Sequence, residues 1–453
     1  MSPPSHPTSI LILGSGAFGL STALALTARP CFTNTRITLL DRSPFPSPDG
    51  SSIDTSRIIR ADYSDPSYAS LAASAQSLWR QQGPSELGGE GRYSECGLVL
   101  VADKGRQGER YVQESLENVR KISGQEGEGT IRELKNRKEI DEAVGTGGGS
   151  GDWGYVNTSS GWADAEEGMK WMRRRAEATN RISFVVGEAT SLLKNGNKVL
   201  GATLKDGSTL KAEFTIVATG AWTGKLIDLR GRATATGQVL CYLDLTEQEQ
   251  ERLGKMPVLL NMSTGMFIIP PKNRVLKIAR HSYGYANPVS IPHPSPSPSP
   301  SSSGERIEVS VPRTALDDKQ LWVPREGELA CRQALREMIP ELGERKFSKS
   351  KICWYTDTPS GDFLIDYHPE HEGLFLATGG SGHGYKFLPV IGERIVDVVE
   401  GKHGGWEGVE RELRGKWKWR EEKVDKVVTE DGSRGGRPGM VLDEELRKGI
   451  YRA

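Results

Sequence analysis

The chain has 453 residues, in which 59 basic side chains balance 59 acidic ones, so its formal net charge is zero. This length exceeds what one hydrophobic core usually serves, and two domains are expected. No run of Lys or Arg forms a basic stripe, which argues against nucleic acid or an acidic membrane as a partner. We therefore expect a small-molecule partner.

The cysteines argue against a disulfide framework and against a structural metal site. There are five, scattered singly without a Cys-x-x-Cys pair, at positions 31, 96, 241, 331 and 353. This pattern favours a reducing compartment and no bound metal. The first nine residues lack the basic region of a secretory signal, and Tyr451-Arg452-Ala453 is unlike a peroxisomal Ser-Lys-Leu tripeptide. The sequence predicts a cytoplasmic protein without a membrane partner.

The N-terminal region predicts a strand, a turn and a helix followed by a second strand. Residues 9–14, SILILG, are a leucine- and isoleucine-rich run that ends in glycine, and residues 17–28 continue as a helix of small residues. ITLLD at 37–41 supplies the next strand and ends in an acidic residue. Together these segments predict a βαβ unit of the usual length.

The middle of the chain alternates between helical and strand-like segments. Helices are expected within 64–82 and 104–143. From 183 to 220 several strands are predicted, joined by tight turns at Asn195-Gly196 and Asp206-Gly207.

Residues 236–345 form a block of different character. A Pro/Ser-rich segment at 288–303 interrupts it, and this segment is expected to be a disordered insertion because it cannot pack a core. The expected fold is α/β, with a Rossmann-type domain that contains the βαβ unit, interleaved with an antiparallel-sheet α+β substrate domain. The predicted boundaries are 1–90, 150–235 and 346–405 for the nucleotide domain, 91–149 and 236–345 for the substrate lobe, and 406–453 for a C-terminal surface extension.

A glycine motif joins the first strand to the first helix. Gly14-Ser15-Gly16-Ala17-Phe18-Gly19 has the GxGxxG pattern, whose glycines permit a tight turn and close approach of the backbone to a pyrophosphate. The N-terminus of the following helix stabilises the phosphates. Asp41, at the end of the second strand, is placed to accept a hydrogen bond from a ribose hydroxyl. The pattern predicts a dinucleotide site, and an ordinary glycine turn is the alternative.

Two later segments favour FAD over NAD as the dinucleotide. Residues 214–220, FTIVATG, predict a buried strand that ends in a glycine turn, and the glycine-rich residues 379–384 precede a helix. Three glycine-terminated strands can then converge on one long ligand. This suits FAD, because its flavin end must be met by distant segments of the chain.

Several longer segments carry more specific motifs. They are GSSIDTSRIIRADYSDPSYASLA (50–72), TSSGWADAEEGM (158–169), FTIVATGAWTGKL (214–226), LKIARH (276–281), CWYTDTPSGDFLIDYHPE (353–370) and SGHGYKFLPVIG (381–392). In this order they resemble the monomeric sarcosine oxidase family of FAD-dependent amine oxidases. The resemblance runs from about residue 8 to about residue 400 and is closest to the fungal saccharopine, L-pipecolate and fructosyl amino acid oxidases.

The resemblance implies roles for three residues near the flavin. The family attaches FAD through a cysteine that opens a Cys-aromatic-Tyr-Thr segment, and Cys353 matches it, with a buried structural cysteine as the alternative. Lys277 matches a lysine that activates dioxygen, since a fixed cation in a dry site stabilises developing negative charge. His281 matches a histidine on the amine-binding side, and a structural histidine is the alternative.

The same resemblance implies that Arg60 and Lys386 bind the substrate carboxylate, through an arginine fork and a point charge. Arg57 matches an arginine that packs over the flavin, and Tyr355 a tyrosine of the substrate pocket. A surface helix is the alternative for the two arginines. The residues predicted to contact FAD are Gly14, Ser15, Gly16, Ala17, Phe18, Gly19, Asp41, Arg42, Ser56, Arg57, Ala218, Gly220, Cys353, Gly382, His383, Gly384 and Lys386.

The implied mechanism is hydride transfer from the substrate carbon to the flavin, hydrolysis of the imine and reduction of dioxygen to hydrogen peroxide. Residues 51–56 depart from the GDTR motif of bacterial sarcosine oxidases, and fructosyl amino acid oxidases commonly lack the full SRIIR found here. At this point the match is therefore best to the saccharopine and pipecolate branch. The alternatives are a fructosyl amino acid oxidase, a tailoring flavin oxidoreductase of a secondary-metabolite pathway, a dehydrogenase with another electron acceptor, and a flavin-binding protein without catalysis. We expect a monomer whose partners are an amine or amino acid and dioxygen.

Overall fold

A six-stranded sheet carries the N-terminal βαβ unit in the computed structural model, which describes residues 6–124, 129–294, 305–319 and 321–450. Its order is β22-β23-β13-β1-β2-β9, and neighbouring strands are parallel except β22 with β23. The predicted βαβ unit is confirmed. The strands are β1 (Ser9–Leu13), β2 (Arg36–Asp41), β9 (Ile182–Val186), β13 (Phe214–Val217), β22 (Leu364–Tyr367) and β23 (Leu374–Thr378).

Both faces of this sheet are covered, which explains why β1 is apolar throughout. Ile10 and Ile12 pack in the helical layer, whereas Leu11 and Leu13 pack with a three-stranded sheet on the other face. A parallel strand buried on both faces is typically a continuous apolar run. The helical layer contains α1 (Ala17–Ala28), α2 (Pro66–Trp79), α5 (Ala165–Ala178) and α9 (Leu388–Val399), and the small sheet β10 (Ala189–Asn195), β11 (Lys198–Leu204) and β12 (Thr209–Lys211).

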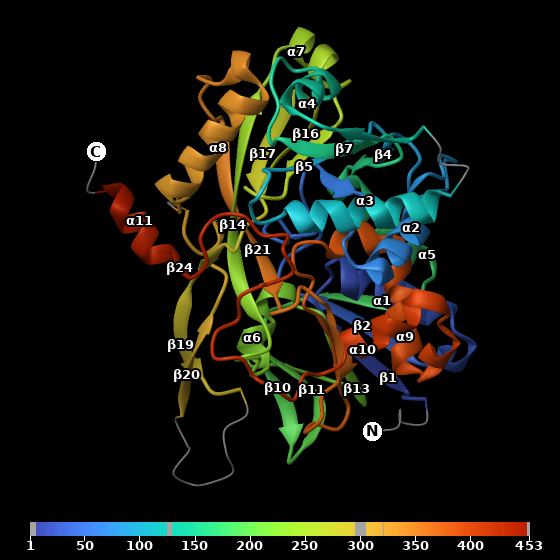
Figure 1. Ribbon diagram of the computed structural model, residues 1–453. Helices are drawn as coiled ribbons and strands as arrows, with labels where there is room; N and C mark the ends of the chain where they lie inside the picture. The colour runs from blue at the N-terminus through green and yellow to red at the C-terminus, as the bar shows by residue number, and fades with distance from the viewer. Residues whose placement is uncertain (1–5, 125–128, 295–304, 320, 451–453) are drawn as a thin grey trace.

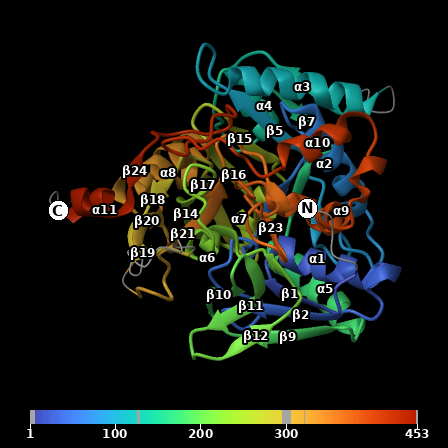
Figure 2. The same cartoon turned by 90° about the horizontal axis from the view of Figure 1, so that it is seen from below.

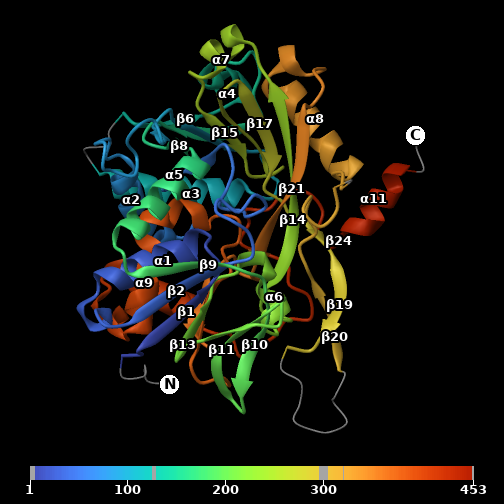
Figure 3. The same ribbon diagram turned by 180° about the vertical axis from the view of Figure 1, so that it is seen from behind.

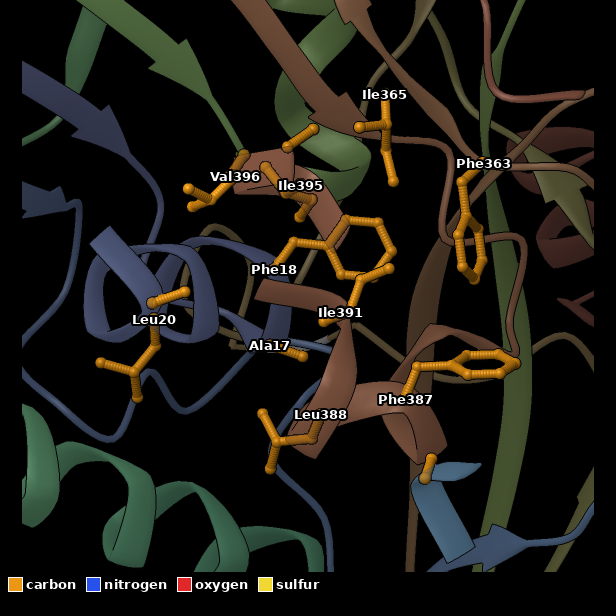
Figure 4. Packing of buried hydrophobic residues seen from close by; sticks show 14 of the residues in the cluster. Ala17, Phe18, Leu20, Phe363, Ile365, Phe387, Leu388, Ile391, Ile395 and Val396 are labelled. Atoms are coloured by element: carbon orange, nitrogen blue, oxygen red, sulfur yellow. The ribbon is translucent and has the colours of Figure 1, made fainter. Parts of the chain in front are cut away.

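Aromatic side chains near the start of α1 centre the helical layer. Phe18 meets Phe363 edge-on with ring centroids 5.1 Å apart, and Phe363 lies 5.6 Å from Phe387 (Figure 4). A Cβ atom on Gly392 would lie 2.2 Å from the backbone oxygen of Ser21, so α1 and α9 can approach closely only because this position is glycine. The packing holds the glycine turn before α1 against the segment that precedes α9.

A ten-stranded, mostly antiparallel sheet forms the other large part of the fold. Its longest strand, β14 (Thr234–Asp244), runs between α8 (Arg325–Met338) on one side and α1 and α9 on the other (Figures 1 and 3). The predicted combination of a Rossmann-type α/β domain with an antiparallel-sheet domain is confirmed. The other strands are β5 (Leu98–Ala102), β6 (Ile131–Leu134), β7 (Trp153–Asn157), β15 (Val258–Asn261), β16 (Met266–Lys272), β17 (Val275–Arg280), β18 (Tyr285–Ala286), β21 (Lys349–Asp357) and β24 (Met440–Val441).

Two strands join a different sheet from the one that the predicted boundaries imply. β7 pairs with β5 and β6, and β21 pairs with β14 along its whole length. Residues 153–157 and 349–357 therefore lie in the large sheet, although the sequence boundaries put them in the nucleotide domain. Composition identifies a strand but not its neighbour, because pairing depends on the path of distant segments.

The shorter elements agree with the sequence patterns. The helix predicted within 64–82 is α2, and the region 104–143 holds α3 (Glu109–Ser123) and most of α4 (Arg137–Val144). The predicted tight turns join β10 to β11 and β11 to β12. The remaining elements include β3 (Arg57–Ile59), β4 (Tyr93–Ser94), β8 (Gly161–Ala163), α6 (Thr223–Leu226), α7 (Glu247–Leu253), α10 (Arg411–Lys416) and α11 (Leu442–Ile450).

Part of the segment predicted to be a disordered insertion is a strand. β19 (Pro288–Pro292) pairs antiparallel with β20 (Arg306–Ser310). Val289 and Ile291 pair with Val309 and Ile307, so β-branched residues form a ladder before the Pro/Ser repeat begins. The prediction was therefore wrong for 288–292, and residues 295–303 lie outside the described residues.

The C-terminal segment, residues 406–441, is more than the predicted surface extension. Trp406 and Trp417 are buried, and the Trp417 indole N–H donates to the Tyr68 hydroxyl at 2.9 Å. Beyond α10 the chain crosses the molecule to β24 at the edge of the large sheet (Figures 1 and 2). The charged composition of the segment predicts a surface location, so these tertiary contacts could not be predicted from it. Within the described ranges, no helix is long and apolar enough to cross a membrane.

Candidate active site

The glycine turn after β1 lies at one end of a long cavity. Gly14 has a φ of 99°, and a Cβ atom there would lie 2.4 Å from the backbone oxygen of Ala218. A Cβ atom on Gly19 would lie 1.9 Å from the Gly14 oxygen, so only glycine lets the helix approach the strand. Gly16 lines the cavity, where its bare backbone can approach a phosphate at the helix N-terminus.

Polar side chains continue the cavity beyond the glycine turn. Asp41, at the end of β2, accepts hydrogen bonds from the backbone N–H and the hydroxyl of Ser15, both at 2.7 Å. The Arg42 guanidinium lies over the Trp222 ring, 4.3 Å from its centroid. This is the end at which the ribose and phosphates of a dinucleotide are expected.

The flavin end of the cavity is built on β21 and β3. Cys353 is 5% exposed, and its Sγ atom lies 3.7 Å from Arg57 Nη2. Tyr355 is two residues further along β21 and lines the same cavity, because alternate side chains of a strand share a face. A Cβ atom on Gly382 would lie 2.4 Å from the Tyr355 ring, so the turn after β23 packs on this ring only as glycine.

A buried carboxylate, Asp54, joins two of the predicted cations. Its Oδ2 atom accepts from Lys277 Nζ at 3.1 Å and from the Arg57 guanidinium, and its Oδ1 atom accepts from the Tyr242 hydroxyl at 2.9 Å. Lys277 is 1% exposed and also donates to the backbone oxygen of Ser56. Sequence reasoning missed Asp54, although its position three residues before Arg57 was a signal for an ion pair.

Burial and charge act in opposite directions on the pKa values of this cluster. Burial would raise the pKa of Asp54, but Lys277 and Arg57 hold it well below its usual value, so the carboxylate stays ionised. Burial lowers the pKa of Lys277 to about 8, against the attraction of Asp54. The cavity wall therefore contains a buried ammonium group whose charge depends on one carboxylate.

Arg60 and Lys386 form a second cationic group, around two tyrosines. Arg60 Nη2 donates to the Tyr111 hydroxyl at 3.2 Å, and the guanidinium lies 4.8 Å from the centroid of the Tyr63 ring. Lys386 Nζ donates to the Tyr63 hydroxyl at 2.8 Å, and burial followed by the charge of Arg60 holds its pKa well below the usual value. Arg60 Nη1 is buried without a hydrogen-bond partner in the described part of the chain, which is costly for a charged group.

Two neutral histidines complete this end. Burial lowers the pKa of His383 well below its usual value. Its Nε2 atom lies 2.9 Å from the Gly361 oxygen, and its Nδ1 atom lies 2.9 Å from the Tyr63 hydroxyl. Because a carbonyl only accepts, Nε2 carries the proton and Nδ1 accepts from Tyr63. Burial, followed by the charges of Arg434 and Arg60, likewise lowers the pKa of His281.

Most of the predicted site residues line this cavity. Gly19 and Ser56 do not, because Gly19 packs the helix on the strand and Ser56 presents its backbone oxygen to Lys277. Sequence reasoning also missed Tyr63, Tyr111 and Arg434. The predicted residues that line the cavity are Gly14, Ser15, Gly16, Ala17, Phe18, Asp41, Arg42, Arg57, Arg60, Ala218, Gly220, Lys277, His281, Cys353, Tyr355, Gly382, His383, Gly384 and Lys386.

The residues of the cavity fit an FAD molecule. Bare glycine backbone and a helix N-terminus at one end suit a pyrophosphate. The other end offers a thiol, aromatic rings and buried cations, which suit a flavin and an anionic substrate.

The sequence profile described as FAD dependent oxidoreductase matches residues 9–398. The chain belongs to this family. The match includes every strand of the six-stranded sheet and both cationic groups of the cavity, so FAD is the cofactor of this oxidoreductase. The C-terminal segment lies beyond the matched residues.

Known proteins similar to this oxidoreductase are amine and amino acid oxidases. It is 32% identical over 472 aligned residues to the amino acid oxidase imqH of Aspergillus flavus, covering 91% of this chain and 98% of the relative. It is 28% identical to L-saccharopine oxidase of Schizosaccharomyces pombe, covering 91% and 93%. The crystal structure of fructosamine oxidase from Aspergillus fumigatus (Amadoriase II) in complex with FSA superposes with a TM-score of 0.78 at 28% identity, covering 97% and 96%. The resemblance to the fungal branch is confirmed.

Proposed function

We propose that this oxidoreductase is an oxidase of secondary, N-substituted amino acids, such as saccharopine, L-pipecolate or an N-methyl amino acid. The observation that carries the proposal is Arg60, a cavity-lining residue whose buried Nη1 atom has no partner among the described residues. A substrate carboxylate satisfies this donor. Bound FAD supplies the acceptor for the hydride that leaves the amine-bearing carbon.

Arg60 and Lys386 bind the substrate carboxylate together. An arginine presents two parallel donors to a carboxylate, and lysine adds a point charge. The arriving anion also raises the pKa of Lys386 toward its usual value and so favours the charged form. The pair thus selects an acid and fixes the position of the neighbouring carbon relative to the flavin.

Lys277 acts in the second half of the reaction, in which dioxygen takes up the electrons and leaves as hydrogen peroxide. A fixed cation in a dry site stabilises the negative charge that develops on oxygen. The supporting observations are that Lys277 is 1% exposed and is held by Asp54 at 3.1 Å. With a pKa of about 8, its ammonium group is charged at neutral pH.

Cys353 holds the flavin covalently through its Sγ atom. All five cysteines lie in the described residues, and of these only Cys353 lines the cavity. It stands at the flavin end, beside the Arg57 guanidinium. Cys31, Cys96, Cys241 and Cys331 are left with packing roles.

A fructosyl amino acid is the second candidate substrate, favoured by the likeness to a fructosamine oxidase over nearly the whole chain. Such a substrate carries the same carboxylate and secondary amine, so Arg60 and Lys386 serve both candidates. The predicted monomeric state, the cytoplasmic location, the two-domain boundaries and the absence of nucleic-acid and membrane partners stay predictions.

Anaerobic mixing with candidate substrates tests the oxidase proposal. The flavin absorbance should bleach with at least one of L-pipecolate, saccharopine, sarcosine and fructosyl-valine, and admitting air should release peroxide. Piperidine is the matched control for L-pipecolate, because it keeps the ring amine but lacks the carboxylate. No bleaching with any N-substituted amino acid would overturn the proposal.

Acid precipitation tests the covalent link separately. The pellet should stay yellow for the native protein and turn colourless for Cys353→Ala, which should still bind FAD reversibly. If the native pellet is colourless, Cys353 does not hold the flavin.

A further inference from the structure

The C-terminal segment brings a buried arginine against His281, a residue that lines the cavity. Arg434 is 1% exposed, and its Nη2 atom donates to Asp357 Oδ1 at 2.7 Å and to the backbone oxygen of Ser381 at 2.9 Å. Its Nη1 atom lies 3.1 Å from Nδ1 and 3.2 Å from Nε2 of His281. The guanidinium also lies 5.6 Å from the centroid of the Tyr355 ring. Arg434 therefore links the end of β21, the turn after β23 and the residue that follows β17.

The loop that carries Arg434 is also fixed to His281 through the backbone. Gly435 N–H donates to the His281 oxygen at 3.0 Å, and a Cβ atom on Gly435 would lie 1.9 Å from the Thr264 oxygen. The Ser433 hydroxyl, 3.4 Å from His281 Nε2, is held by Asp431. Figures 1 and 2 show this part of the chain crossing from α10 to β24. One loop thus holds both the backbone and the ring of the histidine.

We propose that Arg434 is a positioning residue that keeps the imidazole of His281 neutral and fixed in orientation beside the substrate. This inference rests on the proposed oxidation of an amino acid at the same site. The Arg434 Nη1 atom lies almost equally far from both ring nitrogens, so the guanidinium contacts the face of the imidazole. A fixed cation this close repels a second positive charge on the ring and so favours the neutral imidazole. Asp357 supplies the counter-charge without which the buried guanidinium would be costly.

The surroundings of His281 supply further reasons for a neutral ring. The groups with charge or a titrating proton that face it are Arg434, Arg60, His383 and Lys386, with Tyr355 against the ring and Asp357 and Asp431 beside Arg434. Burial lowers the pKa of His281 most, and Arg434 has the largest effect of the neighbouring charges. Another cation here would repel a substrate amine that still carries its proton. A neutral, oriented imidazole can instead accept from that amine.

Nuclear magnetic resonance of isotope-labelled histidine tests the proposal without any turnover. The chain has seven histidines, so the signal of His281 can be identified by its loss in His281→Asn. In the native protein we expect a neutral ring that titrates only well below the usual pKa of histidine. In Arg434→Gln the midpoint of the titration should rise toward that usual value. A native His281 that titrates near its usual pKa would overturn the proposal, as would an unchanged titration in the variant.

Arg414→Gln is the matched control. Arg414 belongs to the same C-terminal segment and donates to Asp366 at 2.7 Å, and it is not among the charges that act on His281. This variant should leave the His281 signal unchanged. If Arg434→Gln does not fold, the native titration still decides the question, and Arg434→Lys provides a second variant that keeps the charge but cannot bridge three partners.

Flavin reduction by substrate gives a separate readout. In Arg434→Gln its rate should fall as the pH decreases through the raised pKa of His281, and the added His281→Asn substitution should abolish this dependence. An unaltered pH profile, with an unaltered histidine signal, overturns the role of Arg434. If the native protein reduces no substrate, the proposed function fails, while the histidine titration continues to test the positioning role on its own.

Discussion

The two ends of the cavity are built in different ways. At the glycine turn bare backbone lines the cavity, and Gly14, Gly16 and Asp41 all come from the first βαβ unit, although Trp222 joins Arg42 from farther along the chain. At the flavin end the wall consists of side chains, and Arg60, Lys277 and Cys353 come from separate parts of the chain. The phosphates of FAD are the same for every substrate, so a local backbone motif can bind them. A particular substrate needs side chains that only the tertiary fold brings together.

The buried cations of the flavin end fall into two groups. Lys277 and Arg57 share Asp54, and Arg434 pairs with Asp357. Arg60 and Lys386 contact tyrosines and form no ion pair among the described residues. Because a buried charge without a counter-ion is costly, the second group is the one left for a ligand anion. The cations that already have a carboxylate are the ones proposed to act on the flavin, on oxygen or on His281.

Gly19→Ala should have the largest effect, because its Cβ atom would lie 1.9 Å from the backbone oxygen of Gly14. The helix must move away from the strand, and we expect a loss of about 3 kcal/mol or more in the free energy of unfolding. FAD binding should be lost with it. Thermal unfolding and flavin content measure both effects. Gly404→Ala is the control, since a Cβ there meets nothing within 4 Å. Normal FAD binding by Gly19→Ala would contradict the idea that close backbone packing forms the dinucleotide end of the cavity.

Arg60→Gln should leave FAD binding at the dinucleotide end unchanged and weaken substrate binding at the flavin end. Hydrogen bonds to a charged group contribute about 1.5–3 kcal/mol, so kcat/KM for an amino acid should fall by roughly ten- to a hundredfold. Flavin content should stay unchanged. Steady-state kinetics check this, with Arg110→Gln as control, because the Arg110 side chain is 88% exposed. Unchanged kinetics in Arg60→Gln would remove the main support for carboxylate binding.

The contrast between the two ends also explains what the sequence could predict. The glycine motif and Asp41 were found from local pattern alone. A tight turn sterically requires glycine at fixed positions, and this requirement is visible within a few neighbouring residues of the sequence. Arg60, Lys277 and Cys353 lie in motifs that the family shares, and local pattern alone would not have distinguished them from surface or core residues. The resemblance, not the composition, identified the flavin end.

Arg434 and Asp54 were missed for physical reasons. Arg434 lies in a segment rich in Lys, Glu and Gly, a composition typical of the protein surface. It is buried because this segment runs back to the large sheet, where β24 pairs with β18. Asp54 is significant only because β17 places Lys277 beside it. The same limit applies to β21, which the predicted boundaries put in the nucleotide domain but which pairs with β14 in the large sheet. The roles of these residues depend on contacts between segments that are distant in the sequence, and local pattern does not show such contacts.

Asp54→Asn should slow the reoxidation of reduced flavin by oxygen more than the reduction of the flavin by substrate. Losing the carboxylate removes what raises the pKa of Lys277, so that pKa should fall further below about 8. In the native protein, reoxidation of reduced flavin should slow as the pH rises through about 8. In the variant this decline should begin at lower pH, with a rate roughly tenfold lower at pH 8.

Stopped-flow mixing of reduced protein with oxygen measures this reoxidation, and anaerobic mixing with substrate measures the other half-reaction. Asp366→Asn removes a carboxylate that pairs with Arg414 away from the cavity, and it should change neither rate. If Asp54→Asn slows both half-reactions equally, Asp54 organises the whole flavin end and does not act through Lys277.

Asp41→Asn should have the smallest effect, and only under one condition. Its carboxylate is placed for a ribose contact at the dinucleotide end, so it contributes affinity and takes no part in the chemistry. In a covalently tethered enzyme, flavin content should not change. In a Cys353→Ala background the Kd for FAD should rise by up to about tenfold, as expected for one hydrogen bond, while kcat at saturating FAD stays the same. Titration of the apoprotein measures the Kd. A change in kcat would mean that the two ends of the cavity are coupled. Binding of the dinucleotide by the backbone at one end would then also position the reacting groups at the flavin end.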